Sequence, residues 1–136
     1  MQLSAAFTPS FEAGFHVNME GPKAAVRDGS VFEYCRLNNT VIQAWSVLQH
    51  GYFEGNFVGN EEFAALNHVL NDLAKKYQVT PTAIALAWVL RYPGKMQAVI
   101  GTTKPQHVLE VGKAAEVTLT RKEWYQIYLS AGNDLP

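Results

Sequence analysis

The stretch TVIQAWS at residues 40–46 decides the fold class of this 136-residue chain. Its β-branched and aromatic residues predict a buried strand. A helix is predicted just before it, over residues 30–37, because Ser30 and Glu33 have the spacing of a capping box and Asn38-Asn39 ends the pattern. A strand that follows a helix after so short a turn is typical of the repeating units of α/β proteins.

Two helices are predicted after this strand. The first begins at Asn60 and carries apolar residues at helical spacing, namely Phe63, Leu66, Leu70, Leu73 and Tyr77. The second begins at Thr80-Pro81, where a threonine N-cap is followed by proline at the first helical position, and it runs to about Arg91. Because this second helix is apolar nearly all round, we expect it to be deeply buried.

The remaining predicted elements are two strands and two helices, over residues 2–7, 97–101, 105–115 and 120–131. Thr103 is placed to cap the first of these helices, and Thr120 opens a second capping box. A long loop, rich in Gly, Pro and Asn, is predicted over residues 8–28. The alternation of elements predicts one α/β domain over residues 1–136 with about three parallel strands, which form either an open sheet or a segment of an eight-stranded barrel.

Composition and charge exclude several classes of function. The chain has 11 basic and 12 acidic residues and a net charge of −1, which argues against binding to nucleic acid or to an anionic membrane. Its longest apolar run, residues 83–90, is far shorter than the roughly 20 residues that cross a bilayer. The single cysteine, Cys35, excludes an internal disulfide and suits a reducing compartment, so we expect a cytoplasmic protein.

Residues suited to binding stand at the carboxyl ends of two predicted strands. The sequence contains no complete catalytic motif and no histidine pair at metal-ligand spacing, so it predicts no metal site. Trp45 offers a flat π face on which a planar ring can stack, and a core aromatic is the even alternative. Residues 101–104, Gly-Thr-Thr-Lys, open a helix whose free N–H groups, hydroxyls and lysine can hold a phosphate, and an ordinary helix cap beside a surface lysine is the alternative.

Three segments of the chain share their order and spacing with a known family. They read QAWSVL, IGTTKPQHV and LTRKEWY, at residues 43–48, 100–108 and 119–125. They resemble the seventh strand, the eighth strand and the last helix of aldo-keto reductases, and most closely the bacterial oxidoreductases whose seventh strand reads Gln-Ala-Trp-Ser. The resemblance implies the carboxy-terminal part of such a protein, a partial (half) TIM-type β/α barrel with flanking helices.

The resemblance also implies which residues contact a nicotinamide ring and its pyrophosphate. In this family an aromatic residue of the seventh strand stacks on the nicotinamide, and it corresponds to Trp45. The serine and leucine that follow contact the pyrophosphate and correspond to Ser46 and Leu48. A glutamine at the start of the sixth strand binds the nicotinamide carboxamide and corresponds to Gln2.

A second set of residues corresponds to the adenosine end of the cofactor. The loop after the eighth strand holds the 2′-phosphate in this family and matches Gly101, Thr102, Thr103 and Lys104. Glu110 matches a glutamate near the adenine, but His107 and Val111 replace the usual arginine and asparagine. The resemblance implies NADP as the cofactor. Because a neutral imidazole clamps phosphate less well than a guanidinium, NAD is left open as the alternative.

The family's four catalytic residues are an aspartate, a tyrosine, a lysine and a histidine. They come from strands before the sixth, and this chain begins at the sixth. We therefore expect the chain to be part of an oxidoreductase that reduces a small-molecule carbonyl with NADP(H). As a fragment that lacks the catalytic residues, it is expected to be inactive alone. The alternative is a non-catalytic half-barrel that acts as a binding or assembly module. Both predict a homo-oligomer, because a partial barrel exposes strand edges and an apolar inner face.

Overall fold

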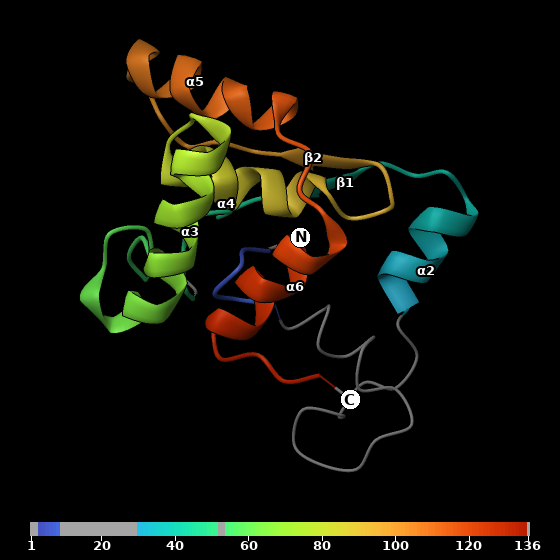
Figure 1. Cartoon of the computed structure of the whole chain (residues 1–136). Coiled ribbons are helices and arrows are strands. Elements are labelled where there is room, and N and C mark those ends of the chain that lie inside the picture. Colours follow the sequence, from blue (N-terminus) through green and yellow to red (C-terminus); the bar gives the residue numbers. More distant parts are fainter. Residues whose placement is uncertain (1–2, 9–29, 52–53, 136) are drawn as a thin grey trace.

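The computed structural model describes residues 3–8, 30–51 and 54–135 (Figure 1). The side chain of Ser30, and with it the predicted capping box, lies outside the described part, as does the predicted loop over residues 8–28 apart from Thr8. In the described ranges a small parallel sheet is flanked by helices, and none of these helices combines the length and the apolar character needed to cross a bilayer.

Two short parallel strands form the sheet. β1 (Ile42–Ala44) pairs with β2 (Met96–Ala98), and Gln43 stands opposite Gln97 in the register. One further backbone hydrogen bond at each end, of 2.8 and 2.7 Å, extends the pairing beyond the strands themselves. The parallel pairing confirms the predicted α/β class, although both strands are shorter than the stretches that predicted them.

Helices connect the two strands. The short 3-10 helix η2 (Glu61–Phe63) leads into α3 (Ala64–Tyr77), and α4 (Pro81–Leu90) follows. Thr80 Oγ1 accepts a hydrogen bond from the Ala83 N–H at 3.2 Å, and proline occupies the first helical position. The predicted start of α4 is therefore confirmed.

α4 is the buried centre of the described chain. Its residues 83–89 are all buried, and the helix contacts α3, β2, α5 (Pro105–Gly112) and the 3-10 helix η3 (Lys113–Glu116) (Figure 1). The predicted deep burial is confirmed. Since each large apolar side chain that is fully buried contributes roughly 1.5–3 kcal/mol, α4 supplies a large part of the hydrophobic stabilisation.

Two further helices flank this core. α2 (Ser30–Leu37) precedes β1, and α6 (Arg121–Ser130) follows η3. The capping box predicted for α6 forms: the Glu123 N–H donates to Thr120 Oγ1 at 3.3 Å, and the Thr120 N–H donates to Glu123 Oε2 at 2.7 Å. Gly132 follows this helix with a φ of +82°, a left-handed conformation that glycine adopts without strain.

The strand predicted at residues 2–7 is wrong where the structure describes it. Ser4 and Phe7 each donate a backbone N–H to the carbonyl of the other, at 3.0 and 3.2 Å, and so close a tight turn. The Leu3 N–H donates to the Trp45 carbonyl at 3.3 Å, which holds the segment beside β1. Because Ser4 and Phe7 satisfy each other's backbone groups, residues 4–7 do not continue as a strand, and the sheet formed by the described residues has two strands.

The predicted cap and end of α5 are also wrong. Lys104, not Thr103, is the N-cap residue, and it makes no capping bond through its side chain. The Lys104 N–H donates instead to Thr102 Oγ1 at 3.2 Å, because a hydroxyl two residues earlier can reach this group in a local turn. The helix ends at Gly112 rather than near Ala115, and η3 continues the chain with a tighter winding.

An aromatic stack joins α4 to α6. The rings of Trp88 and Trp124 lie 4.8 Å apart with planes at 11°, and Tyr128 stacks on Trp124 at 5.7 Å. Each indole N–H donates to the backbone carbonyl of the other tryptophan, at 3.1 and 3.0 Å. Because both N–H groups find partners, the two indoles are buried without an unpaired donor.

A buried carboxylate joins α6 to α3. Glu123 Oε1 accepts a hydrogen bond from Lys76 Nζ at 2.6 Å, and Glu123 Oε2 accepts one from the Tyr77 hydroxyl at 2.8 Å. Burial by itself raises the pKa of this carboxyl. The hydrogen bonds from Lys76, Thr120 and Tyr77 outweigh that effect and lower the pKa of Glu123 to about 2. The charged form of Glu123 therefore stabilises the contact between the two helices.

We predict that Glu123→Gln lowers the free energy of unfolding by about 2 kcal/mol at neutral pH, because glutamine keeps the shape but loses the charge. Since the pKa of Glu123 in the folded chain lies below the ordinary value of 4.5, its contribution is complete above that value and disappears as the pH falls towards about 2. Urea unfolding at neutral pH and at about pH 3 measures both effects. Glu116→Gln, at an exposed position, is the control, and equal losses for the two variants would contradict the prediction.

Candidate cofactor-binding site

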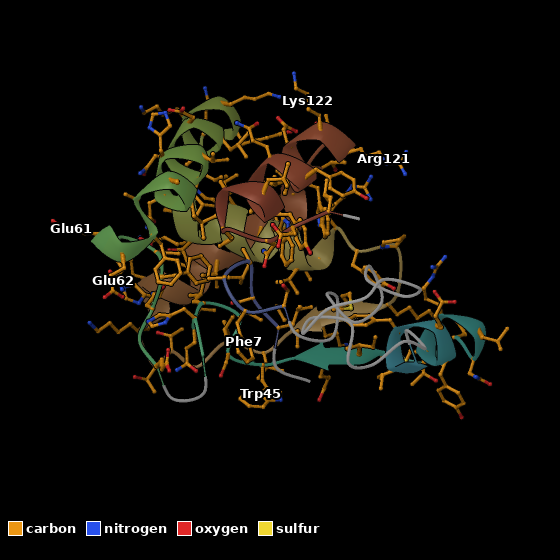
Figure 2. The ribbon with its side chains drawn as sticks, turned by 90° about the horizontal axis from the view of Figure 1, so that it is seen from below. Phe7, Trp45, Glu61, Glu62, Arg121 and Lys122 are labelled. Atoms are coloured by element: carbon orange, nitrogen blue, oxygen red, sulfur yellow. The ribbon has the colours of Figure 1, made fainter. Side chains whose placement is uncertain are left out.

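Trp45 follows β1 directly and lies on the open face of the sheet. Ile42 and Ala44 are buried, whereas Gln43 between them is exposed. Trp45 continues this alternation with 40% of its surface exposed. Figure 2 shows its indole pointing away from the helices at the end of the strand. An aromatic ring that is exposed at this place can stack on a planar group.

The described side chains on the same face of the two strands are uncharged. Gln43 Nε2 donates to Gln97 Oε1 at 3.2 Å, so the two amides lie side by side across the strands. Val41 and Val99 continue the alternation and are about half exposed. The face beside Trp45 is therefore apolar with one pair of amides, which suits a ring that is largely uncharged.

The chain turns sharply after Trp45. Ser46 has a φ of +55°, in the left-handed region that residues other than glycine rarely adopt. The Gln49 N–H donates to the Ser46 carbonyl at 2.9 Å, and the turn brings Leu48 into a half-buried position. Backbone strain of this kind clusters at functional sites, because a precise turn is retained there despite its cost.

The start of α5 forms the second part of the candidate site. β1 and β2 are parallel neighbours, so their carboxyl ends meet at one edge of the sheet, where barrel enzymes bind their ligands. Gly101, Thr103 and Lys104 are exposed and Thr102 is half-buried. The first turn of α5 also exposes His107. Together with Lys104, the backbone N–H groups at this helix end can hold an anion.

Glu110 lies one turn further along α5. Its Oε1 accepts a hydrogen bond from Gln106 Nε2 at 3.0 Å, which holds the half-buried carboxylate against the helix. Val111 beside it is half-buried and packs against the core. Val111, which replaces the asparagine expected from the resemblance, therefore contributes to packing.

The structure brings the predicted residues together as two groups at one sheet edge. The first group is Trp45, Ser46 and Leu48, and the second extends from Gly101 to Glu110. Gln2 lies outside the described residues, so its role and those of the two groups in binding stay predictions. Among the described residues no three His, Cys, Asp or Glu side chains come together as metal ligands.

Asn67 on α3 shapes this region, and sequence reasoning missed it. Its side chain is buried and forms hydrogen bonds with the turn that ends the loop after Trp45. A polar residue within the apolar stripe of a helix, here between Leu66 and Leu70, is the signal that could have identified it, because buried polar groups need specific partners.

Comparison with known proteins points to one family. The family model described as "Aldo/keto reductase family" matches residues 22–128. The chain is similar to a 6-dehydroglucose reductase of Agrobacterium fabrum, with 36% identity over 89 residues that cover 65% of this chain and 28% of that protein. It is also similar to a 6-dehydroglucose reductase of Novosphingobium aromaticivorans, with 27% identity over 94 residues that cover 68% of this chain and 30% of that protein.

A solved structure shares the fold. The crystal structure of a thermostable aldo-keto reductase in complex with the inhibitor epalrestat matches with a TM-score of 0.61 and 22% identity, over 95% of this chain and 38% of that chain. This likeness confirms the predicted partial TIM-type barrel. The chain spans 28–30% of the length of the two curated relatives.

We predict that Trp45→Ala lowers the free energy of unfolding by about 1–2 kcal/mol, whereas Trp88→Ala lowers it by about 3–5 kcal/mol. Trp45 is 40% exposed, while Trp88 is fully buried and stacked. Urea unfolding of the two variants beside the parent chain measures the difference. Equal losses would mean that Trp45 is a core aromatic rather than a residue kept for binding.

Proposed function

The chain belongs to the aldo/keto reductase family, and from this premise we propose that it provides a nicotinamide-binding surface for the reduction of a small-molecule carbonyl. The family is one of oxidoreductases, and the proteins of Agrobacterium fabrum and Novosphingobium aromaticivorans to which the chain is similar are named reductases. The observation that carries the proposal is the exposed indole of Trp45 at the carboxyl end of β1, next to the sheet edge where α5 begins.

The residues at the first group fit a nicotinamide ring. The cofactor, when bound, supplies the hydride. The indole face of Trp45 holds the ring by stacking, and it favours the oxidised ring further because that ring carries a positive charge. The sharp turn at Ser46 directs the following backbone across the sheet edge, where Leu48 and its neighbours can follow the pyrophosphate.

The residues at the second group fit a 2′-phosphate. Lys104 adds a positive charge to the N–H groups at the start of α5, and the Thr102 hydroxyl can still donate its own hydrogen while it accepts the bond from the Lys104 N–H. We therefore propose NADP(H) as the preferred cofactor. NAD(H) is the alternative, because His107 clamps a phosphate less firmly than an arginine does.

Neither Tyr77 nor Tyr92 is suited to be the proton donor of the reduction. Burial and a hydrogen bond to Glu123 raise the pKa of Tyr77, and burial raises the pKa of Tyr92. A raised pKa is the opposite of what an acid needs in order to protonate a carbonyl oxygen at neutral pH. We propose that these 136 residues bind the cofactor without reducing a substrate by themselves. We also propose that the chain is cytoplasmic.

We predict that NADPH quenches the tryptophan fluorescence of the chain in a saturable way and that Trp45→Ala removes most of this quenching, because that indole contacts the nicotinamide. Trp88→Phe is the matched control, since Trp88 is fully buried against Trp124 and should leave the quenching in place. Titrations with NADPH and NADH measure the preference for the 2′-phosphate, which Lys104→Ala should reduce several-fold.

Two results would contradict this set of proposals. Equal quenching of the parent chain and of Trp45→Ala would contradict the proposed stacking. The second result comes from adding a reactive aldehyde to the same mixture. Consumption of NADPH by the parent chain alone would show that a catalytic acid is present after all.

We also propose that the chain associates with itself through the sheet. Among the described residues β2 is an edge strand of a two-stranded sheet. Val99 beside β2 and Val41 beside β1 expose apolar surface. Parallel sheets are normally covered on both faces, and exposed edges recruit further strands. The same open face favours the second candidate function, a non-catalytic module for binding or assembly.

We predict that light scattering of the purified chain gives a mass of at least two chains. Val99→Lys should shift the measured mass towards that of a monomer. Association would bury the lysine charge on the face that the second chain covers, and removing a charge from water is costly. Leu109→Lys is the matched control, since Leu109 is 70% exposed on α5 rather than on the sheet. A monomeric parent chain would contradict the proposed association.

A further inference from the structure

The Asn67 side chain connects α3 to the end of the loop that follows β1. Its Oδ1 accepts a hydrogen bond from the Gly59 N–H at 2.8 Å. Its Nδ2 donates to the carbonyls of Phe57, Asn60 and Phe63 at 2.8, 3.0 and 3.1 Å. The carboxamide therefore uses its acceptor and both of its N–H groups on residues that surround the start of the helix.

The turn at residues 57–60 depends on such a side chain. Phe57 is fully buried, and Gly59 has a φ of +80°, so the backbone here follows neither a helix nor a strand. Gly59 is exposed and Asn60 is half-buried, so the buried backbone group of this turn is the Phe57 carbonyl, which needs a partner because it lies outside regular structure. An amide is suited to this position because it offers a donor and an acceptor at the same place, which an apolar residue such as Leu66 next to it cannot do.

The same turn is bonded to the first group of the candidate site. Phe57 donates its backbone N–H to the Leu48 carbonyl at 3.1 Å, while its own carbonyl accepts the bond from Asn67. The bond from Phe57 to Leu48 is one of the two that form the isolated antiparallel bridge between Gln49 and Asn56. The other is donated by the His50 N–H to the Gly55 carbonyl at 3.3 Å. Through two consecutive hydrogen bonds, Asn67 is thus linked to the backbone of Leu48, which follows the strained Ser46.

We infer that Asn67 is a positioning residue for the cofactor subsite. It fixes the backbone of Phe57 and thereby the place of Leu48 and the turn that begins at Ser46. It does not touch the cofactor itself. This inference rests on the proposed function, because it assigns to Asn67 the geometry of a subsite that is itself proposed.

The test replaces Asn67 by alanine in the 136-residue chain and compares two matched controls. Asn71→Ala removes an exposed asparagine from the same helix. Thr120→Ala removes the cap of α6, which packs at the other end of α3, and lowers stability without touching the loop. Amide hydrogen exchange and NADPH titration are measured for all three variants.

We expect Asn67→Ala to raise the exchange of the Phe57 and Gly59 amides selectively and to weaken NADPH binding by about tenfold or more. The ratio of NADPH to NADH affinity should stay the same, because α5 is unchanged. This ratio separates a positioning role from a general loss of structure, which would affect both ends of the cofactor. Both controls should keep the affinity of the parent chain.

A second variant keeps the inference testable if Asn67→Ala does not fold. Gly59→Ala strains the same turn, because an L residue is disfavoured at a φ of +80°, and its added methyl group meets no atom within 4 Å. It leaves the core in place, so a smaller loosening of the turn and a smaller loss of affinity are expected.

Unchanged exchange at Phe57 and Gly59 in both variants would overturn the inference, as would loosened amides with unchanged NADPH affinity. Failure of the proposed function looks different. In that case the parent chain itself does not bind NADPH, and the exchange pattern still decides whether Asn67 sets the conformation of the loop.

Discussion

A helix that is apolar on every side has to be enclosed, and α4 imposes this requirement on its neighbours. Its residues 83–89 are buried against α3, β2 and the segment after β2. α4 contacts α6 through the exchange of indole N–H bonds between Trp88 and Trp124, which orients the last helix as well as burying it. Loss of this enclosure would expose the apolar surface of α4 to water, and the sheet would lose the layer on which it rests.

The enclosed side of the sheet and its open side have different roles. Ile42 and Ala44 belong to the layer that covers the helices, whereas Trp45 and Val99 lie on the side that no described residue encloses fully. An aromatic ring on the open side contributes little to the packing of the core. Its presence there therefore favours a role in binding. The period of two along a strand thus separates residues kept for packing from residues available to a ligand or to a second chain.

Two buried polar side chains hold this arrangement at opposite ends of α3. Glu123 anchors the end of the helix near Lys76 and Tyr77, and Asn67 anchors its beginning. Both side chains form several hydrogen bonds. These bonds offset the free-energy cost of burying a polar group and hold the bonded segments in one arrangement. The first anchor stabilises the fold, while the second lies where the loop after β1 returns to the helix, and its effect on the candidate site follows from that position.

The sequence by itself determined the class of fold, the order of the helices, the caps at Thr80 and Thr120, and the family, because these depend on local spacing and on residues close together in the chain. The cap and the end of α5 are the exceptions. It predicted Trp45 as a binding residue only with the help of the resemblance, since an aromatic at a strand end is equally common in a core. Tertiary structure decided the rest. Ser4 closes a turn instead of extending the sheet, and Asn67 reaches across to Phe57, because hydrogen bonds between distant or competing partners are chosen by packing and cannot be read from spacing.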